Sequence, residues 1–122
     1  MYEVMIRTEF ASAHNLRNYE GSCETLHGHN WKADIVVQAE ELDEIGLALD
    51  FNLLKARAAE IINDLDHIYL NEHEAFREDN PSSENIARYI FKEIGKTLDK
   101  GVKIKKVTVW ETDDAAASYF ED

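Results

Sequence analysis

The chain has 122 residues, which is enough for one domain with its own core and leaves no room for a second, so we treat residues 1–122 as a single domain. Its net charge of −12 argues against nonspecific binding to nucleic acid or to an anionic membrane. The single cysteine excludes an intrachain disulfide, residues 1–10 resemble neither a signal nor a transit peptide, and no apolar run could cross a bilayer. We therefore expect a soluble, cytoplasmic protein.

Two segments alternate between a mainly apolar and a mainly polar row of positions. In residues 2–14 the even positions are the apolar ones, and in residues 27–39 the odd positions are. Side chains alternate between the two faces of a strand, so both patterns predict strands with one inward face. His14, His27 and His29 all lie in the inward rows. We expect the two strands to form an antiparallel pair that brings these three imidazoles to one side.

Three inward imidazoles need polar partners, and a shared divalent ion would serve all of them. Three neutral imidazoles with one open position are typical of catalytic zinc, whereas structural zinc is closed by four protein ligands. We therefore predict a Zn²⁺ site at His14, His27 and His29. Each histidine taken alone would more simply be a hydrogen-bonded core residue.

Cys23 lies in residues 15–26, whose composition is typical of a loop rather than of a tight hairpin. It precedes His27 by four positions. Three roles remain open for it: a fourth ligand, a reactive thiol, or an inert small residue. A loop position beside a metal motif favours the reactive thiol, although the negative charge of Glu24 disfavours a thiolate.

A first helix is predicted after residues 46–51, which read as a short strand or an extended lead-in. Asp50 or Asn52 can cap its start. Apolar residues then recur at spacings of three and four, the period of one helix face: Leu54, Ala58, Ile61, Leu65 and Ile68. Asp66 and His67 near the expected end are equally consistent with capping and with a functional pair.

A second helix is predicted to begin within residues 81–84, which supply a serine cap and a carboxylate in the first turn. Glu84 is most simply that first-turn carboxylate. The inward stripe has four members: Ile86, Ile90, Ile94 and Leu98. Gly101 is the expected stop. Residues 102–112 and, after a turn, residues 115–120 read as two further strands.

The predicted order is β, β, helix, helix, β, β, which is an α+β domain. Glu111, near the end of the third strand, is either exposed or aimed into a pocket. The alternation does not decide between the two, because Lys103 and Lys105 share its side.

Five motifs together resemble the 6-pyruvoyl-tetrahydropterin synthase superfamily. They are Phe-x-x-Ala-His at 10–14, Cys-x-x-x-His-Gly-His at 23–29, Asp-His at 66–67, Pro-x-Ser-Glu-Asn at 81–85 and Trp-Glu-Thr at 110–112. The spacing between Cys23 and His27 is most similar to the 6-carboxy-5,6,7,8-tetrahydropterin synthase branch, which serves queuosine and other 7-deazapurine biosynthesis. The resemblance covers nearly the whole chain.

The resemblance implies the tunnelling fold, an antiparallel sheet with two helices packed on one face. It implies trimers that pair into hexamers, with active sites at the subunit interfaces. It also implies a zinc-dependent lyase that converts 7,8-dihydroneopterin triphosphate to 6-carboxytetrahydropterin and releases triphosphate and acetaldehyde.

The resemblance further implies a role for each motif residue. The zinc ligands would be His14, His27 and His29. Cys23 would move protons on the substrate side chain, and Asp66 and His67 would form a supporting relay. The residues that bind the pterin would be Glu111, Ser83 and Glu84. Redox changes in this scheme are internal to the pterin, so no nicotinamide or flavin is needed, and the sequence carries no nucleotide-binding glycine motif.

Other functions stay open at this point. Within the enzyme class, the chain could make 6-pyruvoyltetrahydropterin or cleave dihydroneopterin as an aldolase. Outside it, the domain could be a zinc-stabilised binding module without turnover. The net charge of −12 is an awkward background for a triphosphate, for which Arg7, Arg17 and lysines of another subunit are the candidate contacts.

Overall fold

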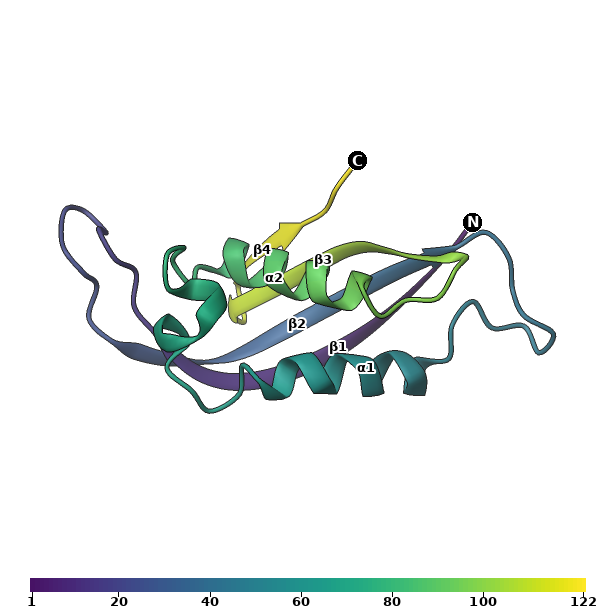
Figure 1. Cartoon of the computed structure of the whole chain (residues 1–122), viewed down its shortest axis with the longest axis horizontal. Helices are drawn as coiled ribbons and strands as arrows, with labels where there is room; N and C mark the ends of the chain where they lie inside the picture. The colour runs from purple at the N-terminus through teal and green to yellow at the C-terminus, as the bar shows by residue number, and fades with distance from the viewer.

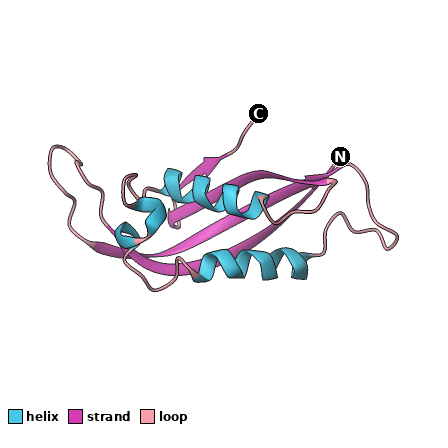
Figure 2. Ribbon diagram, viewed as in Figure 1, coloured by secondary structure: helices cyan, strands magenta, loops and turns pink.

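The computed structural model describes all residues from 1 to 122 as an α+β domain with the predicted element order. The four strands are β1 (Tyr2–His14), β2 (His27–Ala39), β3 (Val102–Thr112) and β4 (Ala115–Tyr119). They form one antiparallel sheet in the order β1-β2-β3-β4. The helices α1 (Phe51–Asn63) and α2 (Ser83–Gly95) lie on the same side of this sheet (Figures 1 and 2). Neither helix combines the length and apolar character that crossing a membrane requires.

The first two strands pair in the register that their alternation requires. Tyr2 lies opposite Ala39, and His14 lies opposite His27. The even positions of β1 face the helices, so Phe10 is buried in the core and His14 is only 1% exposed. Figure 1 shows that the loop following β1 and the loop following β2 extend from opposite ends of the molecule. The histidines therefore lie at the end of the sheet where the loop 15–26 begins and ends.

The first helix is shorter than its apolar spacing predicts. The side chain of Asp50 caps it by accepting a hydrogen bond from the backbone N–H of Asn52 at 2.8 Å, as expected. The helix ends at Asn63 instead of continuing to Ile68, because the backbone beyond it hydrogen-bonds to β1. The N–H of His67 donates to the carbonyl of Ala11 at 2.5 Å. The buried stripe of the helix accordingly consists of Leu54, Ala58 and Ile62, with Ile61 only partly buried.

The second helix is capped by Ser82, whose hydroxyl accepts a hydrogen bond from the N–H of Asn85 at 3.2 Å. It ends at Gly95, and Gly101 instead turns the chain into β3 with a φ of 95°. Of the two alternatives predicted for residues 46–51, the short strand is absent. The segment before α2 contains two short 3₁₀ helices, Leu70–Glu72 and Glu74–Phe76.

A bulge in β3 decides which way its distal half faces. Val36 lies opposite Lys106 and Val37 lies opposite Ile104, so Lys105 is an extra residue in the ladder. An extra residue shifts the alternation by one position. Inward positions beyond the bulge are therefore odd, and Val107 and Val109 are fully buried. Glu111 continues this row on the same face as the three histidines.

Candidate active site

Three strands deliver four potential ligands to one point. His14 ends β1, His27 and His29 begin β2, and Glu111 lies near the end of β3. One ligand atom from each residue lies within 4.8 Å of every other. We call these four residues the imidazole cluster. Four possible ligand atoms thus lie together within a single chain. They come from the paired ends of β1 and β2 and from the end of β3 beyond its bulge.

Main-chain carbonyls fix the tautomers of two of the rings. The Nδ1 of His14 donates to the carbonyl oxygen of Pro81 at 2.7 Å, and the Nδ1 of His27 donates to the carbonyl oxygen of Thr25 at 2.8 Å. The Nε2 atoms of His14 and His27 are then unprotonated in the neutral rings, and they face each other at 3.1 Å. Two lone pairs at this distance repel, so the arrangement favours a cation between them.

His29 completes the set with an atom that lacks any partner. Its Nε2 is buried and makes no hydrogen bond within the protein. Burial lowers the pKa of the His29 imidazole, and the charge of Glu111 opposes this shift without reversing it. The neutral form, which has a lone pair available for a metal, is therefore favoured. A buried nitrogen that makes no hydrogen bond lies beside two lone pairs that face each other. This arrangement fits a bound divalent metal ion.

The donor chemistry indicates which kind of metal fits. Imidazole nitrogens together with a carboxylate oxygen suit zinc and related transition metals, whereas calcium and magnesium prefer sites built of oxygen. Trp31 forms the inner wall of the site, with its ring centroid 4.8 Å from that of His14 and 5.1 Å from that of His29. Its indole N–H donates to the carbonyl of Ser12 at 3.1 Å. The rings therefore rest on a rigid, fully buried surface.

Cys23 is not part of the imidazole cluster. It lies exposed in the loop 15–26, and neither a hydrogen bond nor an ion pair connects it to the four clustered residues. The loop itself is anchored near both of its ends. The amide of Asn15 donates to the carbonyl of Glu24 at 3.1 Å, and the carboxylate of Glu24 accepts from the N–H of Leu16 at 3.2 Å.

Asp66 and His67 form an ion pair of 2.9 Å at the edge of β1. The carboxylate of Asp66 accepts the N–H of Ala11 at 2.9 Å, and this bond, followed by that with His67, holds the pKa of Asp66 below its usual value. The φ of His67 is 56°, and its side chain is 80% exposed. The pair lines an open cavity of about 490 Å³ together with outward-facing side chains such as Asn30 and Lys32. It therefore lies apart from the imidazole cluster.

The two remaining predicted residues begin α2. Ser83 is partly buried and Glu84 is exposed, and neither belongs to the imidazole cluster. They are close in sequence to Pro81, whose carbonyl holds His14. The start of α2 is thus tied to the candidate metal site through one main-chain contact.

Two asparagines that the sequence does not single out hold the backbone after His14. Asn71 accepts the N–H of Asn15 at 3.0 Å and donates to its carbonyl at 2.8 Å. Asn80 does the same for Arg17, at 2.8 and 2.9 Å. Each side-chain amide therefore pairs with both the N–H and the carbonyl of one backbone residue, as a neighbouring strand does. Both residues lie in a polar segment that reads as an ordinary loop, and only their pairing in space reveals the role.

The two arginines considered for a triphosphate are engaged within the chain. Arg7 makes a two-pronged ion pair with Asp34 at 2.6 and 2.9 Å. Arg17 donates to the carbonyl oxygens of Phe76 and Asp79 at 2.5 and 2.9 Å. The Nη1 group of each guanidinium has no hydrogen bond within the chain, so these contacts orient both side chains without using all of their donors.

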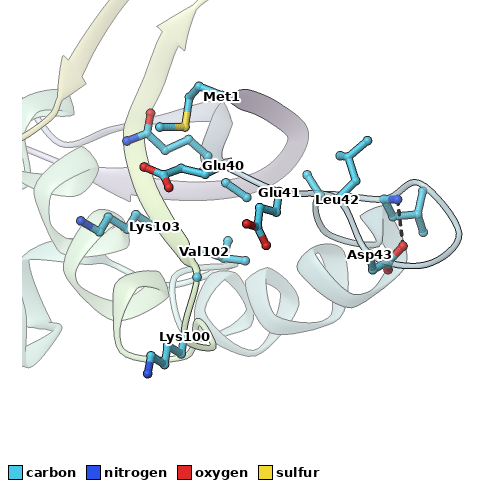
Figure 3. A pocket seen from close by; sticks show the side chains of 13 residues that line it. Met1, Glu40, Glu41, Leu42, Asp43, Lys100, Val102 and Lys103 are labelled. Atoms are coloured by element: carbon cyan, nitrogen blue, oxygen red, sulfur yellow. Dashed lines mark hydrogen bonds between the residues drawn. The ribbon is translucent and has the colours of Figure 1, made fainter.

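The largest cavity, of about 630 Å³, lies at the other end of the sheet, beside the start of β1 and the end of β2 (Figure 3). Its wall includes Glu40, Glu41 and Asp43, with Lys100 and Lys103 across from them. The carboxylate of Asp43 is already used by backbone N–H groups of its own turn. The cavity contains none of the predicted site residues, so its size does not make it the candidate active site.

Comparison with known proteins gives a consistent result. The family model described as 6-pyruvoyl tetrahydropterin synthase matches residues 3–122. A 6-carboxy-5,6,7,8-tetrahydropterin synthase of Synechocystis is 36% identical, covering 98% of this chain and 94% of that protein. A dihydroneopterin monophosphate aldolase of Pyrococcus furiosus is also 36% identical, covering 88% of each.

A similar fold is found among solved structures. The 6-pyruvoyl tetrahydropterin synthase of Caenorhabditis elegans superposes with a TM-score of 0.85 at 22% identity, covering 99% of this chain and 96% of that one. This likeness confirms the predicted tunnelling fold. Together with the family match over almost the whole length, it supports one conclusion: the chain belongs to the 6-pyruvoyl tetrahydropterin synthase family.

Proposed function

We propose that the protein is a zinc-dependent 6-carboxy-5,6,7,8-tetrahydropterin synthase. It would convert 7,8-dihydroneopterin triphosphate to 6-carboxytetrahydropterin and release triphosphate and acetaldehyde. The observation that carries the proposal is the convergence of His14, His27 and His29 on one point, with a buried Nε2 that has no partner. The cysteine spacing before His27 and the 36% identity to the Synechocystis synthase support the choice of reaction.

Each residue type suits the step proposed for it. A zinc ion held by the three imidazoles would act as a Lewis acid and make the adjacent side-chain carbons of the substrate more acidic. Cys23, as a thiolate, would remove a proton from one of these carbons. His67 would return a proton from the other side, with Asp66 orienting its ring through the 2.9 Å ion pair. The pKa of Asp66 is lowered, chiefly by the N–H of Ala11, so its carboxylate stays ionised and can hold the ring in this orientation.

Glu111, with Ser83 and Glu84, is proposed to bind the pterin. A carboxylate can accept two parallel hydrogen bonds from the N–H and the exocyclic amine of a pterin ring. The carboxylate of Glu111 is 35% exposed, so a ring can reach it. The triphosphate contacts stay with the candidates Arg7, Arg17 and lysines of another subunit, because both arginines keep N–H groups without a partner within the chain.

We also propose that the active form is a cytoplasmic homo-oligomer, a trimer or hexamer, with active sites between subunits. In one chain, Cys23 is exposed in the loop 15–26 while His67 is exposed at the edge of β1. Contact between subunits would bring such residues together without rearranging the fold. Closed symmetric assemblies form such interfaces repeatedly from a single chain.

The test is incubation of the purified zinc-loaded protein with 7,8-dihydroneopterin triphosphate, followed by mass identification of the products. The proposal predicts 6-carboxytetrahydropterin and acetaldehyde. A 6-pyruvoyl product without carbon-carbon cleavage would assign the chain to the synthase activity for which the family is named. Absence of any product from a fully metal-loaded oligomer would contradict all of these enzymatic proposals.

A second candidate is an aldolase-like cleavage, favoured by the 36% identity to the Pyrococcus furiosus dihydroneopterin monophosphate aldolase. The same metal centre and base would serve, but the released two-carbon fragment would be glycolaldehyde that still carries the phosphate ester of the substrate, instead of acetaldehyde and free triphosphate. Running the assay with the monophosphate and the triphosphate side by side distinguishes the two. Preference for the monophosphate with release of glycolaldehyde phosphate would favour the aldolase.

A zinc-stabilised binding module without turnover is the candidate from another class. It predicts that removal of the metal unfolds the domain and that Cys23→Ala leaves every measurable property unchanged. The enzyme predicts that Cys23→Ala keeps metal and fold but loses turnover. The core of 19 buried residues indicates that folding does not depend on the metal alone.

A further inference from the structure

Glu111 lies unusually close to two imidazoles without forming a hydrogen bond to either. Its Oε1 is 3.2 Å from the Nε2 of His14 and 3.2 Å from the Nε2 of His29. The Nε2 of His29 nevertheless has no hydrogen-bond partner. A carboxylate placed only to accept a proton from a histidine would lie in line with the ring nitrogen.

The distances fit shared coordination instead. Four ligands about 2.1 Å from a tetrahedral zinc ion lie roughly 3.4 Å from one another. The two carboxylate separations of 3.2 Å and the His14 to His27 separation of 3.1 Å are close to this value. The remaining pairs of ligand atoms lie within 4.8 Å of one another, so the Oε1 of Glu111 is close enough to serve as a fourth ligand, at the position that a catalytic zinc site leaves for water or substrate.

The backbone explains how Glu111 reaches this point and how it could leave. The bulge at Lys105 turns the distal half of β3 so that Glu111 faces the histidines. A second irregularity, between Trp110 and Thr112, interrupts the pairing with β4 beside Glu111 itself. The side chain is 35% exposed, whereas that of His14 is 2% exposed. Glu111 is thus the member of the imidazole cluster with room to move.

We propose that Glu111 is the fourth metal ligand in the substrate-free protein, so that the resting centre is closed by the protein's own carboxylate. Opening the centre to a substrate oxygen requires this carboxylate to swing away. Its proposed contact with the pterin ring would then be its position in the loaded enzyme. The inference rests on the proposed metal centre, but it does not depend on which pterin reaction follows.

The test uses Co²⁺ as the metal and azide as a small probe for an open coordination position, both without substrate. Wild type is compared with Glu111→Gln, which keeps the size and removes the charge, and with Asp114→Asn as the matched control. Asp114 is an exposed carboxylate of the adjacent turn and lies outside the imidazole cluster. Measurements are Co²⁺ affinity by chelator competition, the visible absorption of bound Co²⁺, and azide binding.

The inference predicts that Glu111→Gln weakens Co²⁺ binding by at least about tenfold, the low end of the cost of losing even an outer-shell partner. It also predicts an altered Co²⁺ spectrum and azide binding in Glu111→Gln but not in wild type or Asp114→Asn. Equal affinity, spectrum and azide binding in wild type and Glu111→Gln would overturn it and leave the three-histidine centre standing. Failure of wild type to bind Co²⁺ would overturn the metal centre as well.

Azide binding to the wild-type protein needs no variant and keeps the test decisive if Glu111→Gln does not fold. A closed centre predicts that azide leaves the wild-type Co²⁺ spectrum unchanged. A spectrum that shifts with azide at the concentrations typical of open sites would contradict the inference by itself.

Discussion

The candidate metal ligands and the residues proposed to transfer protons differ in how firmly the fold holds them. His14 and His29 lie on paired strands against a buried tryptophan, and a main-chain carbonyl fixes the ring of His14. Cys23 and His67 are exposed, one in a long loop and the other at a left-handed residue beside β1. One chain therefore brings the candidate metal ligands together, whereas neither of the proposed proton-transfer groups belongs to that cluster. The two sets of residues should respond differently to mutation and to assembly.

The largest effect is expected from removing one of the candidate metal ligands. His29→Ala should weaken metal binding by more than about a hundredfold, beyond the usual cost of losing an outer-shell partner, and abolish turnover. His73→Ala is the matched control, because His73 accepts the N–H of Ala75, packs against Phe76 and Tyr89, and lies outside the imidazole cluster. Elemental analysis and chelator competition measure the effect. Full metal content in His29→Ala would show that the cluster is not the metal site.

Cys23→Ala tests the exposed groups that are proposed to transfer protons. Loss of an acid or base group usually costs roughly a hundredfold to ten-thousandfold in rate. We expect a fall of this size in kcat, with unchanged metal content and Tm, because Cys23 makes no contact with the imidazole cluster. Steady-state kinetics and thermal melts of the zinc form provide the measurement. Unchanged turnover would remove Cys23 from the mechanism and favour a binding module.

Mixing two inactive variants sharpens the comparison further. If Cys23 and His67 meet only between subunits, then co-refolding Cys23→Ala with His67→Ala in equal amounts should restore activity. Random assortment gives about a quarter of the sites both native groups. Each variant refolded alone is the control. A mixture as inactive as its components would mean that both groups act from the same chain.

A smaller effect is expected from Asn71, which holds the backbone between the strand that ends at His14 and the loop that contains Cys23. Asn71→Ala leaves the N–H and carbonyl of Asn15 without their partners and should lower the free energy of unfolding by about 1–3 kcal/mol. Turnover should fall more than metal affinity, because Asn15 begins the Cys23 loop. Asn52→Ala is the control, since only its backbone N–H is used in the helix cap. Equal losses of stability in Asn71→Ala and Asn52→Ala would argue against this role of Asn71.

The smallest effect concerns Asp66 and pH. Its folded-state pKa is lowered, chiefly by the N–H of Ala11 and then by His67, so its ionised form stabilises the fold. That contribution is present above the unfolded pKa of about 4 and is lost as pH falls through the folded value. Asp66→Asn should therefore lower Tm slightly near neutral pH, and the difference should vanish in acid. A difference that grows on acidification would contradict this assignment.

The histidines could be predicted from sequence because regular alternation in β1 and β2 fixes which face each residue occupies. Glu111 was named only through the family resemblance, because the bulge at Lys105 reverses the alternation in β3 and no local sequence pattern predicts the bulge. The first helix was predicted too long because its apolar spacing continues through Leu65, which fills the core from outside the helix. Asn71 and Asn80 were missed because their role depends on contacts across more than fifty residues.

The most direct test of the whole account is the metal content of the freshly purified protein, measured per chain by elemental analysis and repeated for three variants. The account predicts one zinc ion per chain in wild type, in Cys23→Ala and in His67→Ala, and none in His29→Ala. Wild-type protein without a stoichiometric divalent metal, or His29→Ala with a full complement, would contradict it.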